Sequence, residues 1–267
     1  MQDFGFSVAG LVVGLAVGAT GVGGGSLMTP ILILLCGISP AVAVGTDLLY
    51  AATSKSFGVL LHGRHGSLDW KIVGLLASGS VPATFLTLYF LSHYETGPQL
   101  DHLIKLTLAI AIMTTAALAL FQDRLIRLAR QDALRFLRHL HHRGRVPLTL
   151  LCGGLIGTLV TISSVGAGVI GMMLLLLLYP RHDPIKLVGS DLAHAVLITV
   201  IAGIGHASLG TVDYHMLGFL LLGAFPGIWL GTRIGFSLSP RMLKQLIAAF
   251  LVFVGSGMLL KVMAAAV

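Results

Sequence analysis

The chain has 267 residues, of which 56% are hydrophobic and only 10% are charged, whereas soluble domains carry about a quarter charged residues. A globule of this size cannot bury so many apolar side chains in its own core, so the composition excludes an ordinary water-soluble domain and predicts a protein of the lipid bilayer. The net charge of +7 does not indicate nucleic-acid binding, because seven of the seventeen Lys and Arg residues lie between Arg124 and Arg145 and the others are scattered at the ends of apolar runs, as in membrane loops.

The apolar segments follow one order twice along the chain. Two short, glycine-rich segments come first, near residues 4–19 and 27–36. Longer segments follow, each close to the roughly 20 residues that cross a bilayer core; they lie near 41–61, 70–91 and 102–121. After a basic stretch, the order returns with short segments near 148–162 and 169–179 and long segments near 185–205, 214–236 and 242–262.

The two halves also share individual residues, which indicates an internal repeat. The early glycines match at an offset of 143 residues, so that Gly23 corresponds to Gly166. After one inserted residue the offset becomes 144, and further pairs match: Gly45-Thr46-Asp47-Leu48 with Gly189-Ser190-Asp191-Leu192, His62 with His206, Asp69 with Asp213, and Pro82 with Pro226.

The number of crossings predicts how the halves are oriented. Each half crosses the membrane three or five times, depending on whether its short pair re-enters or spans, and both numbers are odd. The halves are therefore expected to have inverted topology. We expect an all-α integral membrane protein, a polytopic helical bundle of two inverted repeats, each with a glycine-broken pair of short helices and three longer helices.

The basic residues predict the orientation of the chain and its division into parts. We expect a first membrane repeat at 1–121, a basic linker at 122–146 and a second membrane repeat at 147–267. The positive-inside rule places the linker in the cytoplasm and both termini outside an inner (plasma) membrane. The linker includes His139, His141 and His142, but a polar loop is a better explanation for them than a metal site, and no cofactor is expected.

Charged residues inside apolar segments require an explanation, because each costs at least about 2.5 kcal/mol on insertion scales. Asp47 and Lys55 lie in the third segment, and Asp191 occupies the matching position of the second half, near His194. One interpretation is that they lie near the membrane surface or only hold helices together. The duplicated aspartate favours a shared functional role, with Asp47, Asp191 and His194 in proton or ion coupling.

The glycine-rich breaks predict a binding site for an anion. Glycine tolerates an unwound backbone, and the free amides at the start of a half-helix favour negative charge; glycines that only allow close helix packing are the alternative. Lys55 has no counterpart in the second half, where Thr199 stands, and would supply positive charge. The expected substrate-binding residues are Gly23, Gly24, Gly25, Ser26, Thr46, Ser54, Lys55, Ser164, Gly166, Gly168 and Ser190.

Ionised aspartates repel anions, and burial favours the neutral form of a carboxyl group. We therefore expect at least one of Asp47 and Asp191 to take up a proton when the anion binds. His62 and His206 occupy equivalent loop positions on opposite sides, so they are interpreted mainly as interfacial or capping residues, with a gate as the alternative.

These motifs resemble those of the TauE/SafE family of sulfite exporters. The resemblance lies in the early run Gly21-Val22-Gly23-Gly24-Gly25-Ser26, in Gly45-Thr46-Asp47-Leu48 followed by Lys55, and in the second-half segments Gly189-Ser190-Asp191 and Gly210-Thr211-Val212-Asp213-Tyr214. It implies a multi-pass inner-membrane protein that exports sulfite, sulfoacetate or a related anion.

The function expected from the sequence is secondary transport of such an anion by alternating access, with proton coupling left open. A cation or other-substrate transporter using Asp47 and Asp191 is the first alternative, and an intramembrane enzyme is a weaker one, so no catalytic residues are assigned. The expected partners are a small anionic substrate and the lipid bilayer; protons and a second copy of the chain remain open, and nucleic acid is not expected.

Overall fold

The computed structural model is helical throughout the residues that it describes, which are 2–20, 25–64, 68–93, 98–130, 144–180, 182–235 and 240–264, apart from short connections. The first half of the chain forms α1 (Gln2–Thr20), α2 (Gly25–Leu34), α3 (Pro40–Arg64), α4 (Trp70–His93) and α5 (Pro98–Arg130). The second half forms α7 (Arg145–Ser163), α8 (Val169–Leu178), α9 (Pro184–Ser208), α10 (Tyr214–Gly235) and α11 (Pro240–Ala264). The long apolar segments predicted from the sequence lie within helices, except that the last residue of 214–236 is outside the described residues.

Length and composition allow several of these helices to cross a membrane. In the described ranges, 5 helices are both long and apolar enough: Trp70–His93, Leu100–Phe121, Arg145–Ser163, Pro184–Ser208 and Tyr214–Arg233. Large apolar side chains are exposed on their outer faces, including Phe85, Leu222 and Trp229, which is expected where lipid replaces water as the solvent. The chain is therefore a polytopic helical membrane protein.

The glycine-broken pairs are less symmetrical in length than the sequence suggested. The first helix of each pair, α1 or α7, has 19 residues, whereas α2 and α8 have 10 residues each and reach only about 15 Å, half of a bilayer core. The difference arises because glycines in α1 and α7 lie inside the helices. These glycines allow a neighbouring helix to pack closely, and they do not end the helix in which they lie.

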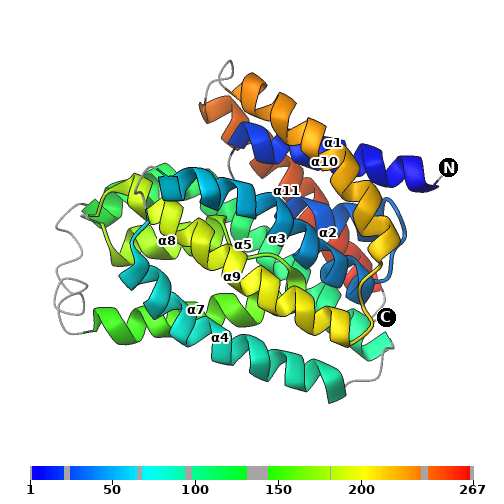
Figure 1. Ribbon diagram of the computed structural model, residues 1–267, viewed down its shortest axis with the longest axis horizontal. Helices are drawn as coiled ribbons and strands as arrows, with labels where there is room; N and C mark the ends of the chain where they lie inside the picture. The colour runs from blue at the N-terminus through cyan, green and yellow to red at the C-terminus, as the bar shows by residue number, and fades with distance from the viewer. Residues whose placement is uncertain are drawn as a thin grey trace.

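Each half packs its first helix against the fourth helix of the other half. α1 lies along α10 and α7 lies along α4, while the equivalent helices α3 and α9 contact each other and α5 contacts α11. The α1–α10 pair and the α4–α7 pair lie on opposite sides of the molecule, with α3 and α9 between them (Figure 1). The hydrophobic core is therefore shared between the halves.

Small residues make the two outer pairs possible. A side chain at Gly14 would lie 2.7 Å from the carbonyl oxygen of Ala224, and one at Gly157 would lie 2.5 Å from the carbonyl oxygen of Ser80. Along α1, successive glycines face successive turns of α10: Gly10 faces Leu220, Gly14 faces Ala224 and Gly18 faces Ile228. The two helices therefore run parallel at backbone contact, as in other membrane helix pairs built on small residues.

The central pair, α3 and α9, runs antiparallel. Thr46, near the start of α3, accepts a hydrogen bond of 3.0 Å from the amide of Asp213, which follows α9. Ser190, near the start of α9, accepts one of 2.8 Å from the amide of Asp69, which follows α3. Thr46 corresponds to Ser190 and Asp213 to Asp69 in the repeat, so these are equivalent bonds at opposite ends of the pair.

The basic linker expected at 122–146 begins and ends in helices. α5 continues to Arg130 and α7 begins at Arg145. Residues 131–143, with the three histidines of the linker, lie outside the described residues.

Candidate functional site

Two aspartates and one lysine lie in the interior of the bundle. Asp47 on α3 and Asp191 on α9 have exposed fractions of 0% and 5%, and that of Lys55 is 4%. The Lys55 ammonium group interacts electrostatically with both carboxylates. Because charges are costly inside an apolar bundle, this mutual compensation is the first condition for the site to exist.

The Asp47 carboxylate is surrounded by hydroxyl groups from three elements. Thr29 of α2 donates a hydrogen bond of 2.5 Å to Asp47 Oδ2. Ser164, after α7, and Tyr50, one turn further along α3, both lie near enough to interact with the carboxylate. Asp47 Oδ1, Ser164 Oγ and the Tyr50 hydroxyl have no hydrogen-bond partner among the described residues. Buried polar atoms without partners are rare in native proteins, so this group of atoms marks the candidate site.

The second half places a carboxylate and an imidazole in equivalent positions. Asp191 Oδ1 lies against Gly171 of α8, where a Cβ atom would lie 2.2 Å from it, and no described residue forms a hydrogen bond with it. His194, which corresponds to Tyr50, places Nε2 2.9 Å from Ser80 Oγ of α4, and its Nδ1 also has no partner in the described part of the chain.

The break between α7 and α8 adds backbone groups to the site. Ser164 adopts a left-handed conformation with φ of 59°, and Gly166 and Gly168 have φ of 129° and 133°. Such values are strained for residues other than glycine, and Ser164 is the one such residue with positive φ in the described ranges. The carbonyl of Ala167 accepts a hydrogen bond of 3.1 Å from Lys55 Nζ. No side chain caps the start of α8, but the amides of Gly171 and Met172 bond to the carbonyls of Gly166 and Gly168. Of the first amides of α8, those of Val169 and Ile170 are left for a ligand.

Comparisons with known proteins identify the family. The model of the sulfite exporter TauE/SafE family matches residues 6–258. The chain belongs to the TauE/SafE family. It is 37% identical over 251 residues to the probable membrane transporter protein YjnA of Bacillus subtilis, covering 92% of this chain and 95% of that protein. A second probable membrane transporter of Bacillus subtilis, YdhB, is 29% identical over 93% of this chain and 96% of its own, and one from Methanocaldococcus jannaschii is 24% identical over 95% and 94%. No solved structure matches the chain.

In this TauE/SafE protein, the predicted site residues separate into two groups. Asp47, Lys55, Ser164, Asp191 and His194 surround the central break. Gly166 and Gly168, predicted to bind substrate, form the backbone of this break with positive φ. Gly25 and Ser26 begin α2, where Ser26 is 8% exposed, and Gly23 and Gly24 lie outside the described residues.

The second group of predicted residues makes structural contacts. Thr46 and Ser190 form the equivalent hydrogen bonds that join the ends of α3 and α9. Ser54 donates a hydrogen bond of 3.2 Å to the carbonyl of Ala51 in its own helix. In this conformation the hydroxyl groups of these three residues form hydrogen bonds within the protein.

Four groups at the site were not among the predicted residues: Thr29, Tyr50, Ser80 and the carbonyl of Ala167. Tyr50 could have been found, because the repeat aligns it with His194 and it lies one turn after Asp47. Thr29 and Ser80 are ordinary hydroxyl residues in apolar segments, and a backbone carbonyl carries no sequence signal. Their roles depend on contacts between residues 18, 114 and 112 positions apart.

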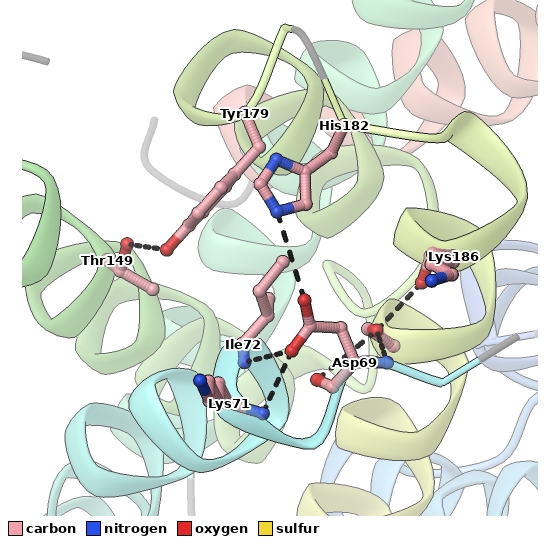
Figure 2. Close-up of polar contacts among 8 residues, drawn as sticks. Asp69, Lys71, Ile72, Thr149, Tyr179, His182 and Lys186 are labelled. Atoms are coloured by element: carbon pink, nitrogen blue, oxygen red, sulfur yellow. Dashed lines mark hydrogen bonds and ion pairs between the residues drawn. The ribbon is translucent and has the colours of Figure 1, made fainter.

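The two ends of the TauE/SafE bundle differ in their polar contacts. At the start of α4, Asp69 Oδ1 accepts hydrogen bonds of 3.0 and 3.4 Å from the amides of Lys71 and Ile72, and Asp69 Oδ2 lies 3.8 Å from His182 Nε2. Figure 2 shows this cluster beside the hydrogen bond of 3.0 Å between Thr149 and the Tyr179 hydroxyl. Asp213, the equivalent of Asp69, likewise accepts a hydrogen bond of 2.9 Å from the amide of Met216. The residues that correspond to Thr149 and Tyr179 at the offset of 143 are Phe6 and Cys36, so the Thr149–Tyr179 bond has no equivalent in the first half.

The opposite end contains a cavity of about 230 Å³. Its lining includes Ala41, Leu91, Ser92, Leu100, Ile104, His206, Leu209 and Thr211. His206, expected to be an interfacial or capping residue with a gate as the alternative, is 2% exposed in the last turn of α9. Its ring nitrogens lie 2.9 Å from Thr211 Oγ1 and from the carbonyl of Thr161, because polar groups of the neighbouring segments satisfy it inside the bundle. The side chain of His62 lies outside the described residues.

Proposed function

We propose that this protein is a secondary transporter that exports a small sulfur-containing anion, sulfite or a small organosulfonate such as sulfoacetate. Alternating access between two inverted repeats would carry the anion through the inner membrane, with the linker in the cytoplasm and both termini outside. Membership of the TauE/SafE family supports this class of substrate. The antiparallel packing of the equivalent helices α3 and α9 supports the inverted arrangement.

The burial of the Lys55 ammonium group is the main support for an anionic substrate. Among the residues whose burial the structure describes, Lys55 is the only buried lysine or arginine. It lies beside the α7–α8 break, where the Ser164 hydroxyl has no hydrogen-bond partner among the described residues and no side chain caps the helix that follows. A buried cation, a hydroxyl donor and free amides are the groups that replace the hydration shell of an oxyanion.

Proton coupling would resolve the repulsion between the anion and the carboxylates. Asp47 Oδ1 and Asp191 Oδ1 are buried and have no hydrogen-bond partner among the described residues, and a protonated carboxyl group would donate a hydrogen bond from that position. We propose that an anion and a proton occupy the site together, with His194 beside them through its free Nδ1.

A cation transporter is the second candidate, because one cluster of atoms favours it. The partnerless oxygens of Asp47, Tyr50 and Ser164 and the hydroxyl of Thr29 form the all-oxygen donor set that hard cations prefer. The positive charge of Lys55 opposes this use of the site.

Flux measurements in proteoliposomes test both candidates. We expect sulfite or sulfoacetate to leave the vesicles faster than from protein-free liposomes, and sulfate and thiosulfate serve as size and charge competitors. A pH gradient that drives protons in the direction of the anion should accelerate the flux. Asp47→Asn and Asp191→Asn should remove this acceleration, whereas Ser78→Ala, which removes an exposed hydroxyl bonded within its own helix, should retain it. Sodium movement without flux of any anion would support the cation transporter.

A further inference from the structure

His206 bonds to the last turn of α7, next to the break that contains Ser164. α7 ends at Ser163, and the amide of Val165, which would bond to the carbonyl of Thr161 if the helix continued, has Ser163 Oγ as its acceptor, 3.3 Å away. The Thr161 carbonyl oxygen instead lies 2.9 Å from His206 Nε2. A carbonyl oxygen can only accept, so Nε2 carries the proton of this bond. His206 thereby supplies a donor that the end of α7 lacks.

The other ring nitrogen of His206 bonds to the segment between α9 and α10. In the neutral imidazole Nδ1 accepts, and the Thr211 hydroxyl, 2.9 Å away, is the donor. The same hydroxyl lies 3.0 Å from the carbonyl of His206, but that carbonyl already accepts the amide of Thr211. Gly45 packs so closely on this segment that a Cβ atom would collide with the carbonyl oxygen of Thr211. One imidazole therefore joins the segment packed beside Asp47 to the helix end that carries Ser164.

His206 also forms part of the wall of the cavity at this end of the bundle. The lining of this cavity includes His206 and Thr211, and none of its described lining residues belongs to α7 or to the α7–α8 break. Thr161, which the other ring nitrogen contacts, is fully buried, and Ser164 is 2% exposed. The imidazole therefore lies between the cavity and the break.

We propose that His206 is a positioning residue that closes the candidate site toward this cavity, by holding the end of α7 and its break against the segment before α10. The proposal rests on the proposed function in that it assigns the closure to the transport cycle, in which the site closes on one side when it opens on the other. Release of the imidazole from Thr161 would free the end of α7 and let Ser164 separate from Asp47. The site would then open toward the cavity.

A cysteine in place of Ser164 reports this closure directly. With Cys36 and Cys152 replaced by alanine, Ser164→Cys is treated in vesicles with sulfonatoethyl methanethiosulfonate, a membrane-impermeant anionic thiol reagent, from each side in turn. The side of the cavity is the one that labels Tyr214→Cys, at the start of α10. His206→Leu removes both hydrogen bonds and should raise labelling from that side at least about tenfold, as expected when a buried hydrogen bond that holds a closed state is lost. His206→Gln offers a donor and an acceptor and should stay within about threefold of the parent.

Labelling from the opposite side separates closure from a general loosening of the bundle. A residue that only stabilises the fold would change labelling from both sides, whereas loss of the closure should not raise labelling from the opposite side. Thr211→Val keeps the imidazole and removes its donor, so it should raise labelling from the side of the cavity and tests the closure even if His206→Leu does not fold. Ser208→Ala, which removes an exposed hydroxyl bonded to Gly205 in the same turn of α9, is the matched control and should alter neither rate.

The contrast between leucine and glutamine at His206 decides the proposal. Equal labelling in the two variants, or an increase from both sides of the membrane, would overturn it. A wild-type protein that moves no sulfur-containing anion, with the contrast preserved, would contradict the proposed substrate and support the closure.

Discussion

The Asp47 carboxylate takes its neighbours from both halves of the chain. Thr29 on α2 donates a hydrogen bond to it, and Ser164 approaches from the break of the second half. Asp47, Asp191 and Lys55 were found in the sequence because a charge inside an apolar run is conspicuous. Thr29 was not found, since a hydroxyl group costs little in a membrane helix and usually bonds to its own backbone, as Thr115 does to Ala111.

Replacement of Thr29 tests its role at the residue scale. Thr29→Val keeps the shape of the side chain and removes the hydroxyl that satisfies Asp47, which leaves a buried carboxylate oxygen without its donor. We expect the free energy of unfolding to fall by about 1–3 kcal/mol. Thr115→Val, which breaks a 2.7 Å bond to a backbone carbonyl within α5, is the matched control and should cost less. Equal losses in denaturant titrations of the two variants would show that Asp47 does not depend on Thr29.

At the scale of elements, the glycines have two uses that their spacing did not separate. Gly10 and Gly14 lie inside α1 and admit the backbone of α10, whereas Gly166 and Gly168 adopt positive φ and end the helical path before α8. Sequence predicted glycine-broken pairs, but it made α1 and α7 too short. The sequence does not distinguish a glycine that allows close helix packing from a glycine that adopts positive φ. The two uses can be told apart only when the neighbouring helix is known.

Alanine at Gly168 tests the second use. Its φ of 133° is strained for any residue with a Cβ atom, and such strain costs about 1–3 kcal/mol. We expect Gly168→Ala to reduce both stability and flux, because the start of α8 and the carbonyl of Ala167 would shift. Gly218→Ala in α10 is the control, since nothing lies within 4 Å of the added Cβ atom, and helical alanine should be neutral or stabilising. Unchanged flux in Gly168→Ala would show that the α7–α8 break does not take part in transport.

For the whole molecule, the equivalent hydrogen bonds of Thr46 and Ser190 lie at opposite ends of α3 and α9. In the outer pairs α1–α10 and α4–α7, the first helix of each half likewise packs against the fourth helix of the other half. This arrangement is expected of inverted repeats, in which each equivalent pair of positions lies on opposite faces of the membrane.

Side-specific labelling tests the inversion directly. Trp70 and Tyr214 begin α4 and α10, correspond to each other in the repeat, and are 67% and 64% exposed. With Cys36 and Cys152 replaced by alanine, Trp70→Cys should react with a membrane-impermeant thiol reagent from the cytoplasmic side and Tyr214→Cys from the outside. Labelling of both from one side would exclude inverted topology and, with it, the proposed alternating access between inverted repeats.

The amino-acid sequence by itself determined the class of protein and the positions of the long helices, and it predicted an internal repeat and a candidate site at the charged residues. These features are local, because apolar length, repeated motifs and charges inside apolar runs can be read without knowing what lies beside them. The tertiary structure decided which helices pair across the halves, which hydroxyl groups face Asp47, and that Lys55 bonds to the carbonyl of Ala167. Inside a bilayer, a helix face that contacts lipid and one that contacts another helix are built from the same apolar and small residues. The partner of a helix face therefore depends on close packing between distant segments and cannot be read from the sequence of one segment.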